Sequence, residues 1–168
     1  YKYLNKLNLS LEEYMEIMTN RIRRVYNFSR DYENNCNDIV KNKRTKFFPT
    51  QELYKGLKTC IVLDFDGVVT KNSFKELYEL CISRNKVYIC SANPTITGDW
   101  FEKKGLSLPE KIFSMKGKVK KITQLIEISK QHDYTFYVDN EKEYLEYAWL
   151  FGIQTFHWDG KKLSIFQC

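Results

Sequence analysis

The pattern of apolar and polar residues divides the chain into two parts at about residue 58. Before this point, apolar residues recur every three or four positions, which is the spacing of an amphipathic helix. From Thr59 onward, short apolar runs alternate with amphipathic stretches, and this rhythm predicts alternating strands and helices. We therefore expect an N-terminal helical segment, residues 1–58, followed by one α/β domain, residues 59–168.

The second part predicts a parallel sheet, because strands that alternate with helices through short links usually pair in parallel. The expected strands cover residues 59–63, 86–91, 111–115, 134–138 and 153–158, with 163–166 as a closing edge strand. The expected helices cover residues 72–85, 99–104, 118–131 and 141–151. The predicted fold is a Rossmann-like α/β fold, with a parallel sheet of about five strands and helices on both faces.

The N-terminal segment begins a helix at Ser10, which forms a capping-box pattern with Glu13. One face of this helix is apolar, and the opposite face carries glutamate and arginine side chains. The apolar face either packs against the following domain or binds a second subunit or a partner protein. An exposed apolar stripe is a liability for a monomer, which favours packing within the chain.

Composition narrows the class of protein. The sequence contains 26 aromatic residues (12 Tyr, 11 Phe, 3 Trp) and only 3 prolines, which is typical of a folded chain. No apolar run approaches the roughly 18 residues that span a bilayer, so we expect no membrane segment. The five cysteines are scattered and odd in number, which favours free thiols in a reducing compartment such as the cytoplasm.

The formal net charge is +6, and it is unevenly distributed. Residues 1–58 hold 12 Lys and Arg against 7 Asp and Glu, whereas residues 59–168 hold 15 against 14. A basic N-terminal third can attract a polyanionic partner, or it can be an ordinary solvated helix face. Charge alone leaves both interpretations open.

Candidate chemistry begins where the first apolar run ends. The run 59–63 leads directly into Asp64 and Asp66, and Gly67 follows at once. A buried parallel strand has such a continuous apolar run, and ligands of open α/β sheets bind at the carboxyl ends of the strands. Two acids at that edge require a counter-charge, which a metal ion or a lysine can supply.

Polar residues also end two later strands, since Ser91 closes the second and Asp139 follows the fourth. A lysine-rich turn opens the helix between them, with Lys116 and Lys118 as equal candidates for a lysine in the site. We expect the next two lysines, Lys120 and Lys121, to face solvent, and we assign no role to His132 or His157. Because parallel strands end at one edge, these residues should converge.

With these motifs in this order, residues 59–168 resemble the haloacid dehalogenase superfamily of phosphatases. The matching features are Leu63–Thr70 as the first motif, Ser91 as the second, Lys118 or Lys116 as the third and Val138–Glu141 as the fourth. The fourth motif departs from the family's usual pair of acids, since Asn140 stands in the second place. Glu143, four residues after Asp139, could supply the missing carboxylate.

The resemblance implies catalytic roles for these residues. Asp64 would be the nucleophile that forms an aspartyl phosphate, and Asp66 would be the general acid and base. Lys118 would hold the phosphoryl group and keep Asp64 ionised. The Ser91 hydroxyl and the amides after it, beginning with Ala92, would bind phosphate oxygens.

The resemblance also implies a bound Mg²⁺, which suits a site of oxygen ligands. An Asp64 oxygen, the Asp66 backbone carbonyl and Asp139 would hold it. Gly67 would allow the tight backbone turn between the two acids and the following helix. Asn140 and Glu143 would lie beside the metal ligands.

The short intervals between the motifs leave no room for the cap domain that relatives acting on small metabolites usually carry. An open site resembles that of the capless branch, which acts on large substrates such as phosphoproteins or nucleic acid ends. The N-terminal helices or a second subunit could instead form a lid. The alternative function is that of a weak or inactive binding protein on the same fold, and Asn140 is the feature that supports it.

Overall fold

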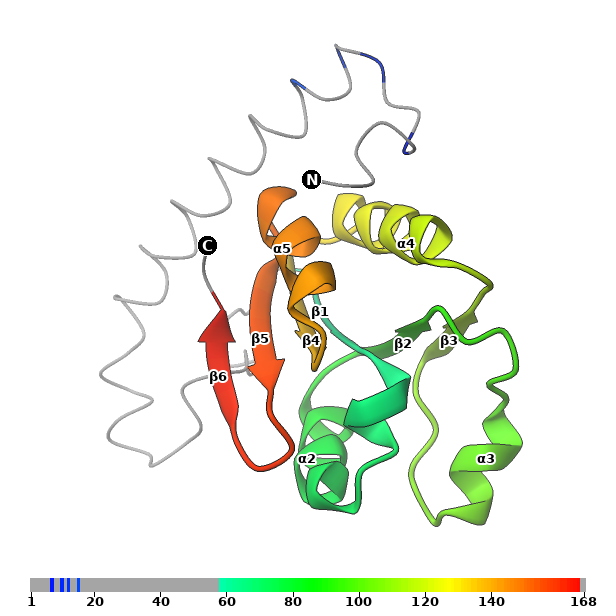
Figure 1. The fold of residues 1–168 in the computed structure, drawn as a ribbon. Coiled ribbons are helices and arrows are strands. Elements are labelled where there is room, and N and C mark those ends of the chain that lie inside the picture. The colour runs from blue at the N-terminus through cyan, green and yellow to red at the C-terminus, as the bar shows by residue number, and fades with distance from the viewer. Residues whose placement is uncertain (1–6, 8–9, 11, 13–14, 16–57, 167–168) are drawn as a thin grey trace.

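The structure is a computed structural model, and it describes residues 58–166 together with Leu7, Ser10, Glu12 and Met15. These residues form a six-stranded sheet in the spatial order β3-β2-β1-β4-β5-β6 (Figure 1). The strands are β1 (Thr59–Leu63), β2 (Val87–Ser91), β3 (Lys111–Ser114), β4 (Tyr134–Asp139), β5 (Gln154–Trp158) and β6 (Leu163–Phe166).

The first five strands are parallel, and β6 pairs antiparallel with β5 at the edge. The predicted α/β fold with a mostly parallel sheet is confirmed. The expected number of about five strands is one short of the six found in the described residues. The sixth strand is the closing edge strand expected at residues 163–166, which turns back after Asp159 and Gly160 and pairs with β5 from Thr155 to Trp158.

Helices cover both faces of the sheet. The α-helices are α2 (Lys75–Arg84), α3 (Gly98–Lys103), α4 (Lys118–Lys130) and α5 (Lys142–Leu150). A π-helical turn, η2 (Phe65–Val69), and a short 3₁₀ turn, η3 (Asn72–Phe74), precede α2. The predicted helix 72–85 therefore begins with a tighter 3₁₀ turn and becomes α-helical only at Lys75.

The alternation of side chains along each strand builds two separate buried clusters. In β1, Ile61 and Leu63 join the cluster that contains residues of α2 and α3, whereas Cys60 and Val62 join the cluster beneath α4 and α5. All four of these side chains are fully buried. A central strand that is apolar on both faces therefore explains the continuous apolar run at residues 59–63.

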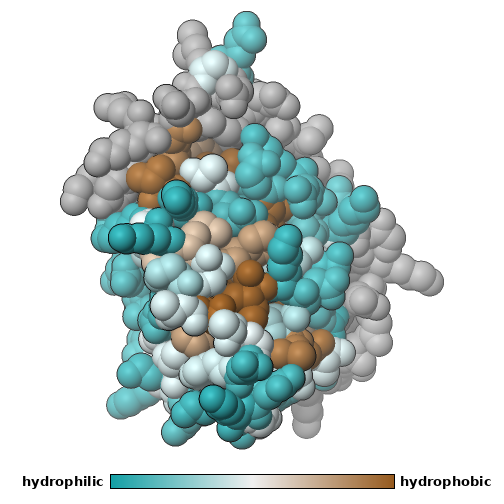
Figure 2. Space-filling view, turned by 90° about the vertical axis from the view of Figure 1, so that its right-hand side faces the viewer, coloured by the Kyte–Doolittle hydropathy of each residue, from teal (hydrophilic) through white to brown (hydrophobic). Residues whose placement is uncertain are grey.

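The outer surface is polar with small apolar areas. Of the described residues, the large apolar side chains that stay exposed are Met15, Leu108 and Ile165. Figure 2 shows the side of the molecule that carries α3 and β3, where brown areas are separated by polar residues. Within the described residues, no helix combines the length and the apolar character needed to cross a membrane.

The predicted N-terminal helical segment, residues 1–58, lies outside the described residues except at four positions and Lys58. At these positions, Glu12 and Met15 have helical backbone, and Leu7 is buried. Leu7 belongs to the buried cluster beneath α4 and α5. The interpretation of the whole segment as packed within the chain or as a partner surface stays a prediction.

Candidate functional site

The carboxyl ends of β1 and β4 meet at the centre of the sheet. After β1 the chain moves outward through β2 and β3, and then returns to β4 on the other side of β1. The strand ends at such a reversal are the place where ligands of open α/β sheets bind. The backbone amide of Asp64 donates to the carbonyl of Val138 at 3.0 Å, which places Asp64 beside Asp139. The two predicted acids are therefore neighbours.

Strand alternation also determines which way these two acids point. Val62 in β1 and Tyr137 in β4 both belong to the buried cluster beneath α4 and α5. Because side chains two residues apart share a face of a strand, Asp64 and Asp139 face the same side. Both are buried, with 6% of Asp64 and 0% of Asp139 exposed.

A lysine lies between the two carboxylates, and it is Lys121. Its Nζ is 2.8 Å from Asp64 Oδ1 and 3.0 Å from Asp139 Oδ2, and only 1% of its side chain is exposed. The expectation that Lys121 faces solvent is wrong. The lysine that contacts both acids is therefore neither Lys116 nor Lys118, whose side chains are exposed. The phosphate-binding role expected for one of these two lysines stays a prediction.

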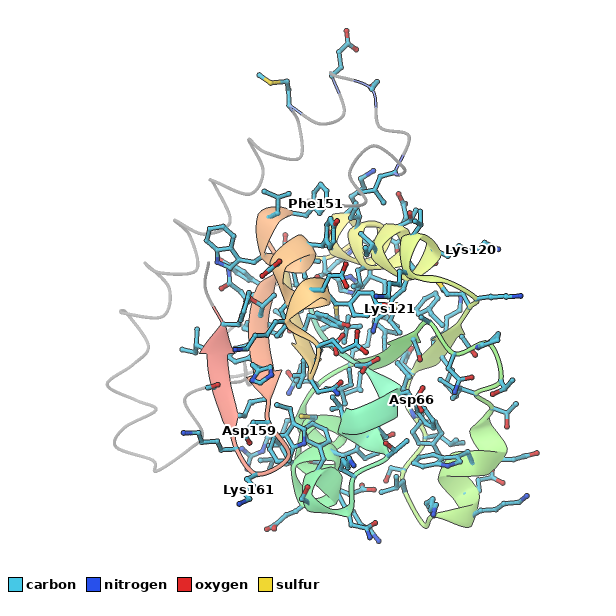
Figure 3. All side chains as sticks on the ribbon, in the orientation of Figure 1. Asp66, Lys120, Lys121, Phe151, Asp159 and Lys161 are labelled. Carbon is cyan, nitrogen blue, oxygen red and sulfur yellow. The ribbon has the colours of Figure 1, made fainter. Side chains whose placement is uncertain are left out.

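Lys121 contacts the acids and Lys118 does not because the two residues lie at different positions along the axis of α4. This helix connects two parallel strands and runs antiparallel to them, so its first residue, Lys118, lies at the outer edge of the site. There Lys118 Nζ contacts Glu143 Oε2 at 3.1 Å. The place expected for Glu143 beside the metal ligands stays a prediction. Lys121 is about 4.5 Å further along the helix at 1.5 Å per residue. It points into the domain, whereas Lys120 points outward (Figure 3).

The site is short of positive charge when both acids are ionised. The pKa of Asp64 is raised to about 8, because burial disfavours the carboxylate and Asp139 repels it, while Lys121 opposes the rise. Burial acts to lower the pKa of Lys121, but Asp139 and Asp64 together raise it, so the lysine is charged. Two carboxylates therefore share one cation.

A buried tyrosine that was not predicted from the sequence, Tyr137, adds to the contacts among Lys121, Asp64 and Asp139. The Tyr137 hydroxyl donates to Asp139 Oδ2, and the Glu141 amide donates to Asp139 Oδ1 at 2.9 Å. Burial, followed by the nearby Asp139 carboxylate, raises the pKa of Tyr137, so its hydroxyl stays a donor at neutral pH. Its position two residues before Asp139 in a strand was the available signal.

The turn after β1 separates the two acids of the first motif. Gly67 has φ +86°, a left-handed conformation that glycine adopts without strain, so the predicted tight turn is confirmed. The Gly67 amide donates to Thr70 Oγ1 at 2.9 Å. The Asp66 side chain is exposed, and its Oδ2 accepts a hydrogen bond from Asn93 Nδ2 at 3.2 Å. Asp66 thus lies at the open side of the site, unlike Asp64.

The loop after β2 is held by two serines. Ser91 is 2% exposed, and its Oγ accepts a hydrogen bond from the Asn93 amide at 3.1 Å. Ser114, at the end of β3, donates to the Asn93 carbonyl at 2.5 Å. These contacts fix the loop that begins with Ala92 and carries the Asn93 side chain to Asp66. The phosphate-binding role expected for Ser91 and Ala92 stays a prediction.

Three oxygens of the site converge on the side chain of Asn140. One terminal atom of this amide lies 3.1 Å from Asp64 Oδ2, 3.1 Å from Asp139 Oδ1 and 3.2 Å from the Asp66 carbonyl oxygen. We assign this atom as Nδ2, because an amide oxygen there would face only acceptors. A Cβ atom at Gly67 would overlap the Asn140 amide, so the absence of a side chain at Gly67 provides the space.

The oxygens around Asn140 have the chemistry expected of a Mg²⁺ site, and the Asn140 amide lies among them. Within residues 58–166 and the four N-terminal positions described, no three His, Cys, Asp or Glu side chains are grouped to hold a metal ion. The oxygens around Asn140 are two carboxylate oxygens and one backbone carbonyl, which is the all-oxygen chemistry that Mg²⁺ prefers. The Asn140 amide lies where these oxygens converge.

Comparisons of the chain with protein-family models, with curated proteins and with solved structures found no match. The function must therefore be inferred from the residues of the site.

Proposed function

We propose that this chain is a magnesium-dependent phosphohydrolase of the haloacid dehalogenase type, which passes a phosphoryl group to Asp64 and then to water. One observation carries the proposal: Lys121 holds two buried carboxylates, Asp64 and Asp139, at the carboxyl edge of the sheet. A buried ionic group is poor evidence of stabilisation, but it is common where charge is used in chemistry. The Rossmann-like strand order, with β1 and β4 at its point of reversal, supports this location.

In the first step, an Asp64 carboxylate oxygen attacks phosphorus as the bond to the leaving oxygen breaks. We assign Asp66 as the acid that donates a proton to the leaving oxygen. It lies two residues after Asp64, and its side chain is exposed. The Asn93 amide group, 3.2 Å from Asp66 Oδ2, holds the acid in position. The products are an alcohol and an aspartyl phosphate.

In the second step, a water molecule attacks the phosphorus of the aspartyl phosphate. Asp66, now ionised, takes a proton from this water, and the bond between phosphorus and Asp64 breaks. The products are inorganic phosphate and the regenerated Asp64 carboxylate, with Asp66 protonated as at the start. One side chain therefore serves as acid and then as base.

Lys121 takes the role that the sequence analysis gave to Lys118. Its ammonium group favours the ionised form of Asp64, against the effects of burial and Asp139, and stabilises negative charge on the phosphoryl oxygens. The Ser91 hydroxyl and the Ala92 amide, at the end of the neighbouring strand, bind further phosphoryl oxygens.

The residues that would hold Mg²⁺ are the three whose oxygens surround Asn140: Asp64, Asp66 through its carbonyl, and Asp139. When bound, the ion supplies the positive charge that the site lacks and reduces repulsion between Asp64 and the anionic substrate. For Mg²⁺ to bind these oxygens, the side chain of Asn140 must move away from them.

The substrate we propose is a macromolecular phosphate, either on a phosphoprotein or at a nucleic acid end. Within residues 58–166, each connection between successive parallel strands holds no more than one α-helix and short turns, so nothing inserted there caps the site. The basic excess of residues 1–58 favours a polyanionic partner. A reducing, cytoplasmic location is consistent with the buried free thiols of Cys60, Cys81 and Cys90.

The test is hydrolysis of an aryl phosphate with and without Mg²⁺, on the wild type and on Asp64→Asn. Glu146→Gln is the control, because Glu146 is exposed on α5 outside the site. We expect magnesium-dependent turnover that is lost in Asp64→Asn and kept in Glu146→Gln. No turnover on the aryl phosphate, on phosphopeptides or on phosphorylated oligonucleotides would exclude the proposal.

The second candidate is a binding protein on the same fold that does not catalyse hydrolysis. The observation that favours it is the Asn140 amide in the position proposed for the ion. In this case, phosphopeptides or oligonucleotides would bind without turnover, and Asp64→Asn would leave their affinity unchanged. The N-terminal helices would then mediate the interaction.

A further inference from the structure

We propose that the Asn140 amide and a divalent cation compete for the same three oxygens, so that Asn140 determines how tightly the site binds the cation. This inference rests on the proposed function only in taking these oxygens as the cation site. The competition follows from geometry, because one atom of the amide lies 3.1–3.2 Å from all three oxygens. A cation that coordinates these oxygens from the same side would overlap the amide nitrogen, because metal–oxygen distances of about 2.0–2.6 Å are shorter than the contacts of the amide.

The amide is an incomplete substitute for a cation. Its nitrogen carries two hydrogens for three acceptors, so at most two of the contacts can be well-aligned hydrogen bonds. It is also neutral, whereas Asp64 and Asp139 share the single charge of Lys121. A divalent cation would supply both the missing charge and the third contact, which gives it an advantage once the amide has left.

The surroundings of Asn140 permit its side chain to leave without a change in the fold. Its backbone carbonyl lies 3.1 Å from His157 Nε2 in β5, and the next amide, of Glu141, donates to Asp139 at 2.9 Å. The main chain is therefore held on both sides of the residue. Asn140 itself is exposed, so a rotation of its side chain carries the amide into solvent.

The space for the inward position depends on Gly67. Its left-handed φ of +86° and its lack of a side chain leave room for the Asn140 amide, whose Cγ would lie only 2.8 Å from a Cβ at this position. The glycine of the first motif and the asparagine of the fourth thus fit together. This pairing makes the inward amide a specific feature of this site rather than a loose surface contact.

The competition reduces the apparent affinity for the cation. If the amide occupies the position for 90% of the time, the apparent dissociation constant rises by about tenfold over that of the open site. Removal of the amide should recover this factor. The site then binds Mg²⁺ more tightly without gaining a ligand.

The experiment measures Mg²⁺ binding by isothermal titration calorimetry on the chelator-treated full chain. Asn140→Ala and Asn140→Ser remove the competing amide, and circular dichroism checks that each variant folds. Gln131→Ala is the control, because Gln131 is an exposed amide at the opposite end of α4. Asn140→Asp is a separate arm, since it adds a charge as well as removing the amide.

We expect the dissociation constant for Mg²⁺ to fall by about tenfold in Asn140→Ala and Asn140→Ser, and to be unchanged in Gln131→Ala. Without cation, the two Asn140 variants should melt below the wild type, and with Mg²⁺ they should gain more in melting temperature. Equal Mg²⁺ affinity in the wild type and both variants would overturn the inference. Absence of binding in every form would overturn it too.

Hydrolysis of an aryl phosphate is measured separately, so that the two proposals can fail independently. Turnover by the wild type with equal affinities in all variants would keep the phosphohydrolase and reject the competition. Tighter Mg²⁺ binding in the Asn140 variants without turnover in any form would keep the competition and reject the phosphohydrolase.

Discussion

Two lysines of helix α4, one turn apart, contact carboxylates, and their contacts differ in burial far more than in distance. Lys118 Nζ lies 3.1 Å from Glu143, with 45% and 37% of the side chains exposed. Lys121 Nζ lies 2.8 Å from Asp64 and 3.0 Å from Asp139, with 1%, 9% and 0% exposed. The same residue type, three positions apart, serves a surface contact and the centre of the candidate site.

This difference in burial decides what each contact does. An exposed ion pair contributes about 0–1 kcal/mol, because water screens it and two long side chains lose freedom. A buried pair gains little net stability over an apolar substitute, but removal of one partner leaves a charge without solvent or counter-charge. Removal of the Lys121 charge should therefore be costly, whereas removal of the Lys118 charge should cost little.

The largest effect that separates the two regions is expected for Lys121→Met, with Lys120→Met as the matched exposed control. Loss of Lys121 leaves Asp64 and Asp139 facing each other, so we expect unfolding free energy to fall by about 3–5 kcal/mol at pH 8. Hydrolysis should fall by about a hundredfold or more. Urea unfolding and the aryl phosphate assay measure the two effects. If Lys121→Met and Lys120→Met have the same stability and activity, Lys121 has no special role in the site.

The next effect concerns pH and the missing positive charge. The raised pKa of Asp64, about 8, means that the folded state holds a proton that the unfolded state has released. Stability without Mg²⁺ should therefore fall as pH rises from about 4 to about 8, on the order of 1 kcal/mol per unit. In Asp64→Asn this slope should largely disappear, and at pH 8 the variant should be more stable than the wild type. If urea unfolding shows the same dependence of stability on pH in Asp64→Asn as in the wild type, the raised pKa of Asp64 is contradicted.

The smallest effect is expected at the exposed pair. Lys118→Met and Glu143→Gln should each change unfolding free energy by about 0.5 kcal/mol or less, and their coupling in a double-mutant cycle should be similarly small. Hydrolysis should stay within about twofold of the wild type, because neither side chain contacts Asp64. A large loss of activity in Lys118→Met would instead return the phosphate-binding role to Lys118.

The acids of the site could be predicted from the sequence because strand ends carry positional information. An apolar run that ends in Asp64, and another that ends near Asp139, place both residues at one edge of a parallel sheet. The order of strands and helices follows from the same alternation. The closing edge strand expected at residues 163–166 is found as β6, and it lies at the edge of the sheet beyond β5.

The lysine could not be chosen from the sequence, because four lysines lie within residues 116–121. Helical periodicity places both Lys118 and Lys121 towards the sheet, and only depth along α4 separates them. The helix begins at Lys118 as predicted, but the distance of its first turn from the strand ends depends on how the preceding loop places the helix, which a sequence pattern does not show. Lysine side chains are rarely buried without a charged partner, so the sequence alone favoured an exposed Lys121.

Asn140 illustrates a different limit. Its departure from a pair of acids is visible in the sequence. Its inward position depends on the space at Gly67 and on three oxygens at the carboxyl ends of β1 and β4. Tyr137 was hidden for a similar reason, because a tyrosine in a buried strand usually indicates only the core. Its hydrogen bond to Asp139 joins side chains two residues apart on one face of β4, which alternation along a strand permits but does not require.

The central claim is that Asp64 carries the phosphoryl group, and detection of the aspartyl phosphate tests it most directly. The wild type is mixed with aryl phosphate and Mg²⁺, quenched in acid, and its peptides are examined by mass spectrometry. The account predicts one phosphoryl group on Asp64, and none on any peptide of Asp64→Asn. Turnover without a phosphoryl group on Asp64, or with Asp64→Asn still active, would contradict it.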